Sequence, residues 1–390
     1  MAVQPYAQVK MNVRPAPRAL YIHVPFCARK CRYCDFASEI VDDYTAEQCL
    51  KSIVAELKYR SRESDVLDSV YIGGGTPSLL TDRQIEELVG AVTSSYEVSN
   101  TAEITIETNP GDCTAALAKT WRRLGINRVS VGAQSFDPEV LDFLGRRHTV
   151  ADVFKTVETL RDAAFTNVSL DLIYGVPNQT PAVWRRSIDQ AIGLEPRHIS
   201  VYALTYEPAT PLAADVEHGT VRPADEETEL EMYRSAIAVI ETAGFRLYEI
   251  SNFARPGSES RHNIVYWRNE PYIGVGPSAV SYIAGVRITN HREIAAYIKS
   301  IESGGSGTAN SEHIPKDMEM AETCIQMLRR SEGIDRKTFF DRFGADVTEV
   351  YADGIAELTH AGLIETTSAA VRHTARGREL ANEVAERFLP

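Results

Sequence analysis

Three cysteines lie within eight consecutive positions of the sequence. Cys27, Cys31 and Cys34 are separated by three and then two residues. A single loop with this spacing can bind three irons of a cubic iron–sulfur cluster, which ordinarily takes four thiolates. The fourth iron is then free to bind a small molecule. The spacing therefore predicts a [4Fe–4S] cluster with one open iron.

Two other interpretations of these cysteines stay open. One is a zinc site completed by a distant His or Cys, although zinc sites favour paired Cys-x-x-Cys segments and the sequence has no second pair. The other is that the three thiols are unrelated core residues. The remaining cysteines, Cys49, Cys113 and Cys324, have no such spacing and are expected to be small buried residues.

Glycines and polar residues follow several of the expected strands. In the turn Gly73-Gly74-Gly75-Thr76-Pro77, the glycines let the backbone approach a ligand closely. Four polar residues lie at or near other strand ends: Glu107, Gln134, Arg146 and Asp171. Taken singly, they are ordinary surface or capping residues. Because the carboxyl ends of parallel strands meet at one edge, we expect them to share a site.

Alternating strands and helices must position these residues. Short β-branched and aromatic runs predict six strands: Ala19–Val24, Ser69–Ile72, Glu103–Glu107, Arg128–Val131, Ser169–Ile173 and Ile199–Leu204. Helical periodicity is clearest over Ala46–Leu57, Asp82–Val92, Ala115–Leu124, Val150–Ala163, Ala182–Ile192 and Glu227–Ala243. This order is typical of βα units around a parallel sheet. Six strands instead of eight predict an incomplete (β/α)6 barrel in an α/β fold.

We divide the chain into four segments. Residues 1–18 form an N-terminal tail, 19–245 the partial barrel, and 246–310 an extension that includes loops and short strands and ends in the glycine-rich linker 304–307. In residues 311–390, helical runs precede a hairpin and a last helix. Helices followed by a small β wing predict a winged-helix-like α+β domain.

The composition excludes several classes of protein. The 390 residues are 44% hydrophobic and 24% charged, which is normal for a large globular chain. The net charge of −13 opposes binding to bulk DNA or to an anionic membrane. No run of about 18 apolar residues and no secretory signal is present. We therefore expect a soluble cytoplasmic protein.

The cysteine spacing after a first strand resembles that of the radical S-adenosylmethionine (SAM) superfamily. The resemblance implies that the amino and carboxylate groups of SAM bind the open iron, and that an electron from the cluster cleaves the sulfonium to a 5′-deoxyadenosyl radical. Arg146 is then expected to pair with the SAM carboxylate. The residues expected to surround SAM are Gly74, Gly75, Thr76, Glu107, Gln134, Arg146 and Asp171.

Longer segments resemble one group of this superfamily, the oxygen-independent coproporphyrinogen III oxidases and the related heme chaperones. The resemblance runs from about Leu20 to the C terminus, and its first segment places Tyr21 beside the cofactors. The segments are Tyr21-Ile-His-Val-Pro-Phe-Cys27, Cys34-Asp-Phe36, Tyr71-Ile-Gly-Gly-Gly-Thr-Pro-Ser78, Glu107-Thr-Asn-Pro110, Asp171-Leu-Ile-Tyr-Gly-Val-Pro177 and Arg261-His-Asn-Ile-Val-Tyr-Trp267.

Three features favour the chaperone branch. The oxidases carry a further cysteine two positions after the third, where this sequence has Phe36. They also have a longer N-terminal extension, whereas twenty residues precede Tyr21 here. Conversely, His262-Asn-Ile-Val-Tyr266-Trp267 fits the HNxxYW motif associated with the chaperones.

The resemblance implies a protein that binds heme and transfers it to apo-hemoproteins, with no residue assigned a catalytic role. His262 can ligate heme iron, with Tyr266 and Trp267 as flat contacts for the porphyrin. The equally weighted interpretation is that His262 and Asn263 cap a turn while the aromatic residues close the barrel edge. The alternative function is oxidative decarboxylation of coproporphyrinogen III in the same SAM pocket.

The resemblance further implies particular partners. They are respiratory enzymes as heme acceptors and bacterioferritin as a donor, with peripheral membrane association only through such partners. No nucleic-acid partner is expected, because a winged-helix-like outline alone does not establish one. A monomer and a dimer are both compatible with the sequence.

Overall fold

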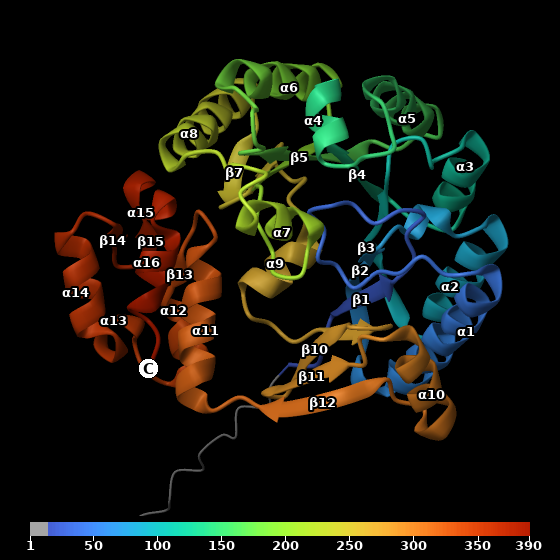
Figure 1. Ribbon diagram of the computed structural model, residues 1–390. Coiled ribbons are helices and arrows are strands. Elements are labelled where there is room, and N and C mark those ends of the chain that lie inside the picture. The colour runs from blue at the N-terminus through green and yellow to red at the C-terminus, as the bar shows by residue number, and fades with distance from the viewer. Residues whose placement is uncertain (1–14) are drawn as a thin grey trace, which may run out of the picture.

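A nine-stranded sheet forms the centre of the computed structural model, which describes residues 15–390. Most of the tail expected at 1–18 therefore lies outside the described residues. Six parallel strands follow one another in chain order, which confirms the incomplete barrel (Figure 1). They are β1 (Ala19–Val24), β2 (Val66–Gly74), β3 (Glu97–Thr108), β4 (Arg128–Gln134), β5 (Asn167–Tyr174) and β6 (His198–Ala203).

Helices cover the outside of these strands (Figure 1). The six predicted ones are present as α1 (Asp43–Arg60), α2 (Asp82–Ser95), α3 (Ala115–Arg123), α5 (Val150–Asp162), α6 (Pro181–Gly193) and α8 (Glu226–Thr242). Short polar residues begin them. For example, Thr81 and Gln84 form a reciprocal capping box at the start of α2, which satisfies two backbone N–H groups that the helix leaves free. Short elements in the connections are η1 (Ser61–Glu63), η2 (Pro77–Leu79), α4 (Pro138–Phe143) and α7 (Pro211–Glu217).

Side chains alternate between the two faces of each parallel strand. On β4, Val129, Val131 and Ala133 pack into the hydrophobic core beneath the helices, whereas Arg128 and Ser130 face a cavity inside the barrel. The same alternation holds on the neighbouring strands β3, β5 and β6, because successive side chains of a strand point in opposite directions. The barrel interior is therefore polar and its outer face is apolar.

Strands that the sequence analysis did not define extend the sheet at both edges. Beyond β6 lie β8 (Asn252–Ala254) and β7 (Arg246–Glu249), both antiparallel to their neighbours. At the other edge, β9 (Ile273–Val275) pairs parallel with β1. A separate antiparallel sheet follows, with β10 (Val280–Ile283), β11 (Val286–Asn290) and β12 (Thr308–His313).

The loops and short strands predicted for this extension are present, among them β9 and β10. The helix α9 (Arg261–Trp267) was not predicted; it begins where the Ser260 hydroxyl accepts from the backbone N–H of Asn263. The predicted linker 304–307 is a tight turn between α10 (Ile294–Gly304) and β12. Gly305 has the left-handed backbone that favours glycine at a helix end, which explains the composition of the turn.

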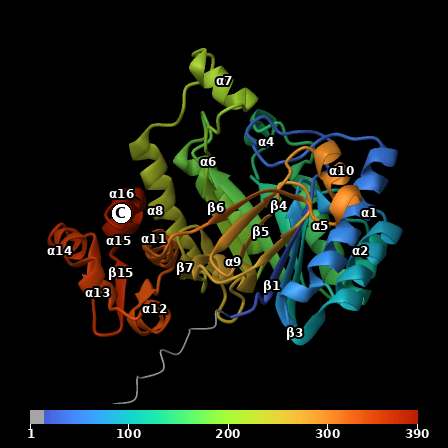
Figure 2. The same ribbon diagram turned by 90° about the horizontal axis from the view of Figure 1, so that it is seen from below.

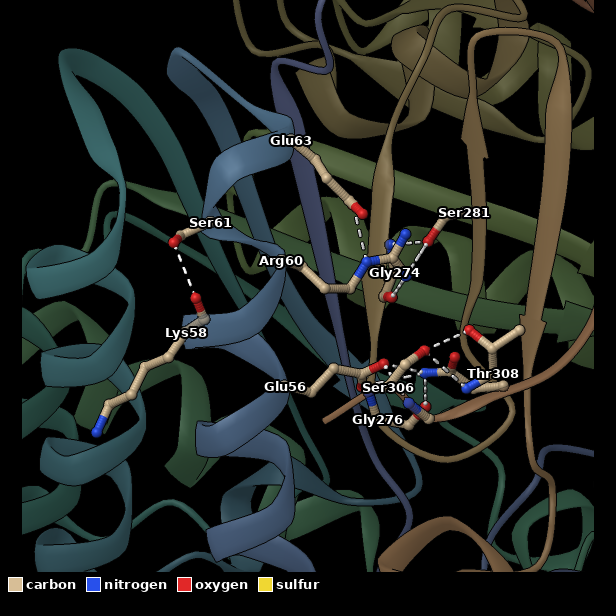
Figure 3. Close-up of polar contacts among 12 residues, drawn as sticks. Glu56, Lys58, Arg60, Ser61, Glu63, Gly274, Gly276, Ser281, Ser306 and Thr308 are labelled. Carbon is tan, nitrogen blue, oxygen red and sulfur yellow. Dashed lines mark hydrogen bonds and ion pairs between the residues drawn. The ribbon is translucent and has the colours of Figure 1, made fainter. Parts of the chain in front are cut away.

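A buried carboxylate fastens this extension to the barrel (Figure 3). Glu56 of α1 accepts hydrogen bonds from the Tyr297 hydroxyl (2.6 Å), the Asn290 amide (2.9 Å) and the backbone N–H groups of Gly276 (2.9 Å) and Gly307 (3.2 Å). One helical turn further along α1, Arg60 donates to the carbonyl oxygen of Gly274 and the hydroxyl of Ser281. These contacts hold β9, the β10–β12 sheet and α10 against α1.

The C-terminal domain has its own hydrophobic core and a three-stranded antiparallel sheet. Its elements are α11 (Lys316–Leu328), β13 (Ile334–Asp335), α12 (Arg336–Phe343), α13 (Val347–Val350), α14 (Ala352–His360), β14 (Ile364–Thr366), β15 (Ala370–His373), α15 (Ala375–Glu379) and α16 (Ala381–Glu386). The predicted hairpin is present, and the predicted last helix is split into α15 and α16. The winged-helix-like outline thus agrees with the structure.

The C-terminal domain packs beside α8 and β7, away from α1 and α2 (Figure 2). The backbone N–H of Ser331 donates to the carbonyl of Tyr248, and Arg234 of α8 forms a two-pronged ion pair with Glu379. Among the described residues, no helix combines the length and the hydropathy that crossing a bilayer requires.

The Glu56 contacts lead to a prediction on stability. Glu56→Ala leaves a hydroxyl and two backbone N–H groups buried without an acceptor and removes one of the two acceptor residues of the Asn290 amide. We therefore expect the free energy of unfolding in urea to fall by about 3 kcal/mol. Glu86→Ala removes a carboxylate that pairs with Arg123 at the surface, and it should cost less than about 0.5 kcal/mol. Equal unfolding midpoints for the two variants would show that Glu56 does not fasten the extension.

Candidate functional site

A cavity of about 640 Å³ opens at the carboxyl ends of the parallel strands. Its lining includes Cys27, Cys31 and Cys34 on one side and polar residues of β2 to β6 on the other. The volume is within the range of small-molecule sites, roughly 300–1,000 Å³. The structure thus brings together the cysteines and most of the strand-end residues that the sequence analysis singled out.

Backbone contacts fix both ends of the cysteine loop. The backbone N–H of Cys27 donates to the carbonyl of Glu39 (3.0 Å), and the N–H of Glu39 donates to the carbonyl of Pro25 (2.8 Å). His23, on β1, has one ring nitrogen 2.7 Å from the carbonyl oxygen of Ala37 and the other 2.9 Å from the Tyr21 hydroxyl. The loop is therefore anchored to the end of β1 at several points.

The three thiols are half-buried and free of disulfides. The Cys27 sulfur lies 3.5 Å from the Thr76 hydroxyl, and the Arg146 guanidinium lies 3.5 Å from the Cys31 sulfur. The other cysteines, Cys49, Cys113 and Cys324, are buried in the core.

The donor set fits an iron–sulfur cluster better than a single metal ion. Within residues 15–390, no three His, Cys, Asp or Glu side chains are grouped closely enough to hold one ion. Zinc would need its thiolates about 2.3 Å from one centre. In a cluster each thiolate binds a separate iron, so the three thiols need not converge on one centre. This agrees with three thiols that line a common cavity.

The glycine turn is packed too tightly for any side chain. A Cβ on Gly74, whose φ is +113°, would lie 2.7 Å from the ring of His23. A Cβ on Gly75 would lie 2.5 Å from the carbonyl oxygen of Phe26. Gly74, Gly75 and Thr76 line the cavity as expected. The glycines therefore allow the turn to pack against the start of the cysteine loop as well as leaving room for a ligand.

Glu107 reaches into the cavity from the end of β3. One carboxylate oxygen accepts from the Tyr71 hydroxyl (2.7 Å) and the other from the backbone N–H of Gly74 (3.1 Å). Removal from bulk water raises the pKa of Glu107 to about 7, opposed by the Tyr71 hydrogen bond and reinforced by the nearby Asp171. Glu107 therefore changes charge near neutral pH.

Asp171 lies on β5, which is separated from the Glu107 strand β3 by β4 alone. Its carboxylate accepts from the hydroxyls of Ser200 (2.7 Å), Ser130 (3.0 Å) and Ser169 (3.3 Å). Burial raises its pKa, and these hydrogen bonds act in the opposite direction. The serines come from three neighbouring strands, so Asp171 is rigidly held.

Arg146 and Gln134 complete the side of the cavity near the cysteines. Arg146 donates to the carbonyl oxygen of Gly132 (2.9 Å) and to the side chain of Asn109, which in turn donates to Thr76 (3.1 Å). Its Nε is buried without a hydrogen-bond partner, and its side chain lines the cavity. Gln134 has a φ of +61°, an unusual backbone conformation for a residue with a side chain and one that is enriched at functional sites.

Tyr21 does not line the cavity. Its contact with His23 instead makes it a support for the cysteine loop. Phe36, by contrast, lines the cavity mouth with 65% of its surface exposed.

The HNxxYW segment forms α9 and lies between the barrel and the C-terminal domain. His262 is 1% exposed, and both ring nitrogens are engaged, one with Ser69 of β2 (3.0 Å) and one with the Tyr266 hydroxyl (2.9 Å). Burial lowers its pKa to about 3, so the ring is neutral at physiological pH. The Trp267 ring stacks under the guanidinium of Arg329 from the C-terminal domain. This geometry favours a role in closing the barrel edge over an exposed heme surface.

Sequence reasoning missed the polar residues deeper in the barrel. Arg128, His198, Ser200 and Tyr202 line the inner part of the cavity. They lie at alternate positions of β4 and β6, so the two-residue period of polar side chains within these strands was the signal that could have identified them.

Family comparisons agree with the architecture. The family model of the radical SAM superfamily matches residues 21–191, and the model of the HemN C-terminal domain matches residues 314–380. The second match begins directly after β12. The E. coli radical SAM enzyme HemN, a coproporphyrinogen III oxidase, has a similar structure, with a TM-score of 0.84, 24% identity and coverage of 96% of this chain and 90% of that one. At this identity the likeness concerns the fold alone.

Curated relatives match almost the whole chain. The heme chaperone HemW of Lactococcus lactis is 34% identical over 96% of this chain and 97% of its own. That of Bacillus subtilis is 34% identical over 95% and 99%. A mitochondrial radical S-adenosyl methionine domain-containing protein 1 of Danio rerio is 36% identical over 84% and 76%. With a three-cysteine loop in a partial barrel and these full-length similarities, the chain belongs to the HemW family of the radical SAM superfamily.

Proposed function

We propose that this protein is a heme chaperone that binds heme and transfers it to apo-hemoproteins, and that it carries a SAM-ligated [4Fe–4S] cluster. The observation that carries the proposal is the similarity to heme chaperones over nearly the full length of both chains. The cysteine loop and polar cavity support the cofactor part of it.

The residues that would hold the cofactors are those on the cavity wall. Cys27, Cys31 and Cys34 would hold the cluster, which supplies one-electron chemistry and an open iron when bound. Arg146, whose guanidinium lines the cavity beside Cys31, would pair with the SAM carboxylate. The SAM amino group and ribose would find acceptors among the remaining predicted residues: Gly74, Gly75, Thr76, Glu107, Gln134 and Asp171.

Heme ligation by His262 would require a rearrangement of α9. Each ring nitrogen of His262 already has a partner, so one of the two hydrogen bonds must break before iron can bind. Tyr266 and Trp267 are half-buried on the same helix. In our proposal, the motif contributes to heme binding only in a state in which α9 has moved away from β2.

Coproporphyrinogen oxidation is the second candidate function, because the overall fold matches that of an oxidase. The residue at the cavity mouth that distinguishes the branches is Phe36, and its phenyl ring cannot replace a thiol. This difference supports the chaperone function.

The partners and location are proposals of the same kind. Apo-hemoproteins such as respiratory enzymes would accept heme, bacterioferritin would donate it, and the protein would act in the cytoplasm, reaching membranes only through its partners. The net charge of −13 supports the absence of nucleic acid among them. We propose that the C-terminal domain serves as a docking platform beside the barrel. A monomer and a dimer are both compatible with this function.

The cluster assignment predicts a difference between cysteines. After anaerobic reconstitution, we expect about four irons and four sulfides in each chain, and we expect Cys27→Ala to lose most of them because one iron loses its anchoring thiolate. Cys113→Ala, which removes a buried thiol outside the loop, should keep them. The measurement is iron and sulfide analysis. Full cluster content in Cys27→Ala would rule out the assignment.

The pKa of Glu107 predicts a pH dependence of SAM binding. Glu107 is ionised above about pH 7 and carries a proton below it, so the attraction for the positively charged sulfonium weakens as the pH falls through 7. We expect SAM affinity, measured by calorimetry on cluster-loaded protein, to fall up to tenfold between pH 8 and pH 6. In Glu107→Gln the affinity should be weaker and independent of pH over this range. The same pH dependence in Glu107→Gln would refute the role of this carboxylate.

Heme transfer tests the proposed function directly. The reduced, SAM-bound protein should bind heme and pass it to an apo-hemoprotein, and it should form no protoporphyrinogen from coproporphyrinogen III. Heme binding is followed by absorbance, and the porphyrinogen products by chromatography. Turnover of coproporphyrinogen, or no binding of heme, would contradict the proposal.

Two variants serve to test the HNxxYW motif in the same assay. His262→Ala removes the imidazole, whereas Tyr266→Phe keeps it and frees one ring nitrogen. If His262 binds the iron, heme binding is lost in the first variant and kept or strengthened in the second. If the motif only closes the barrel edge, both variants lower stability and bind heme equally.

A further inference from the structure

Arg128 is a buried cation that forms no hydrogen bond with the described residues. It is 2% exposed at the first position of β4, and it lines the inner part of the cavity. Its Nε is buried without a partner, and no described group accepts a hydrogen bond from the rest of the guanidinium. Burying a guanidinium without hydrogen bonds costs several kcal/mol, so the donors need an acceptor that comes from outside the chain.

The nearby carboxylates do not supply this acceptor. Glu103 accepts from the backbone N–H groups of Arg261 (3.0 Å) and His262 (3.4 Å), and Asp171 accepts from three serines. Glu107 accepts from Tyr71 and Gly74. These carboxylates balance the charge of Arg128 from a distance but leave its N–H groups unused.

The cavity has room beside Arg128. On β6, which is separated from β4 by β5 alone, His198, Ser200 and Tyr202 line the same cavity. Tyr202 lies near the carboxyl end of β6 and is 41% accessible, because its ring borders the cavity. His198 is neutral, since burial lowers its pKa, and so Arg128 is the cationic side chain in this inner part. A planar guanidinium binds a carboxylate through two parallel hydrogen bonds.

The carboxylate of a SAM bound at the cysteines would pair with Arg146 and leave Arg128 to another acceptor. Arg146, which would pair with that carboxylate, donates to the carbonyl oxygen of Gly132. Gly132 is four residues beyond Arg128 on the same strand. The backbones of the two residues are therefore about 13 Å apart, at a rise of 3.3 Å per residue. A carboxylate at Arg128 therefore belongs to a second molecule in the cavity.

We propose that Arg128 binds a carboxylate of a second ligand in the inner part of the cavity. Resting on the proposed function, we further infer that this carboxylate is a propionate of the tetrapyrrole. A tetrapyrrole enters from the open mouth of the cavity, with one propionate arm directed toward Arg128. Selection of tetrapyrroles by their acid side chains thus occurs inside the barrel.

The test compares zinc protoporphyrin IX with its dimethyl ester, in which both propionates are blocked. Both probes are titrated by fluorescence into the cluster-loaded, SAM-bound protein. We expect the wild-type protein to bind the free acid at least tenfold more tightly than the ester. In Arg128→Gln this ratio should approach one, with SAM affinity changed less than twofold. Arg123→Gln, a variant of an exposed arginine, should behave as wild type.

Each outcome decides between the possible sources of the carboxylate. If Arg128→Gln weakens SAM binding and keeps the preference for the free acid, the carboxylate is that of SAM and the proposal is wrong. Equal wild-type affinities for acid and ester overturn it without any variant. If the wild-type protein binds neither heme nor either of the two probes, the proposed function itself is overturned. Arg128→Lys keeps the buried charge and thus the fold, but loses the paired hydrogen bonds, so its ratio should also fall.

Discussion

The two-residue period of side chains along parallel strands is the constraint on which this site depends. On each strand of the barrel, one set of side chains packs beneath the helices and the other faces inward. The inward set is polar: it includes Glu107 on β3, Ser130 on β4 and Asp171 on β5. A polar interior cannot collapse into a dry core, because its groups would lose their hydrogen bonds with water. The barrel interior therefore stays hollow and becomes a binding cavity.

The same constraint explains how charges are arranged inside the cavity. Burial favours the neutral form of each carboxyl group, as the raised pKa values of Glu107 and Asp171 show. Hydrogen bonds from neutral donors stabilise the ionised form and oppose this effect of burial. Asp171 accepts from three serines, and Glu107 accepts from a tyrosine and a backbone N–H. The two arginines of the interior differ from these carboxylates, because each keeps a buried Nε without a partner. The carboxylates of the cavity thus have their hydrogen-bond donors, whereas its arginines have N–H groups without acceptors. This arrangement suits ligands that accept hydrogen bonds.

Much of this arrangement could be predicted from the sequence, and the part that could not has a physical reason. Six strands, six helices and the meeting of the cysteines with Glu107, Gln134, Arg146 and Asp171 follow from local periodicity and from the topology of parallel sheets. The strand β9 and the Glu56 contacts depend on residues more than 200 positions apart, which no local pattern reveals.

The helix α9 was missed because its aromatic and β-branched residues favour strands locally. Packing between β2 and the C-terminal domain stabilises the helix instead. Tyr21 illustrates a further limit, since a motif marks a residue near a site without telling whether it contacts the ligand or supports the loop that does.

The central claim is that the three-cysteine loop leaves one iron of a cluster for SAM at the top of this polar cavity. Electron paramagnetic resonance of the reduced, reconstituted protein, with and without SAM labelled with ¹⁵N at its amino group, tests it most directly. The claim predicts the signal of a single [4Fe–4S]⁺ cluster whose g-values shift when SAM is added, with a hyperfine coupling from the labelled nitrogen that shows ligation to iron. A cluster signal that saturating SAM leaves unchanged, without any nitrogen coupling, would contradict it.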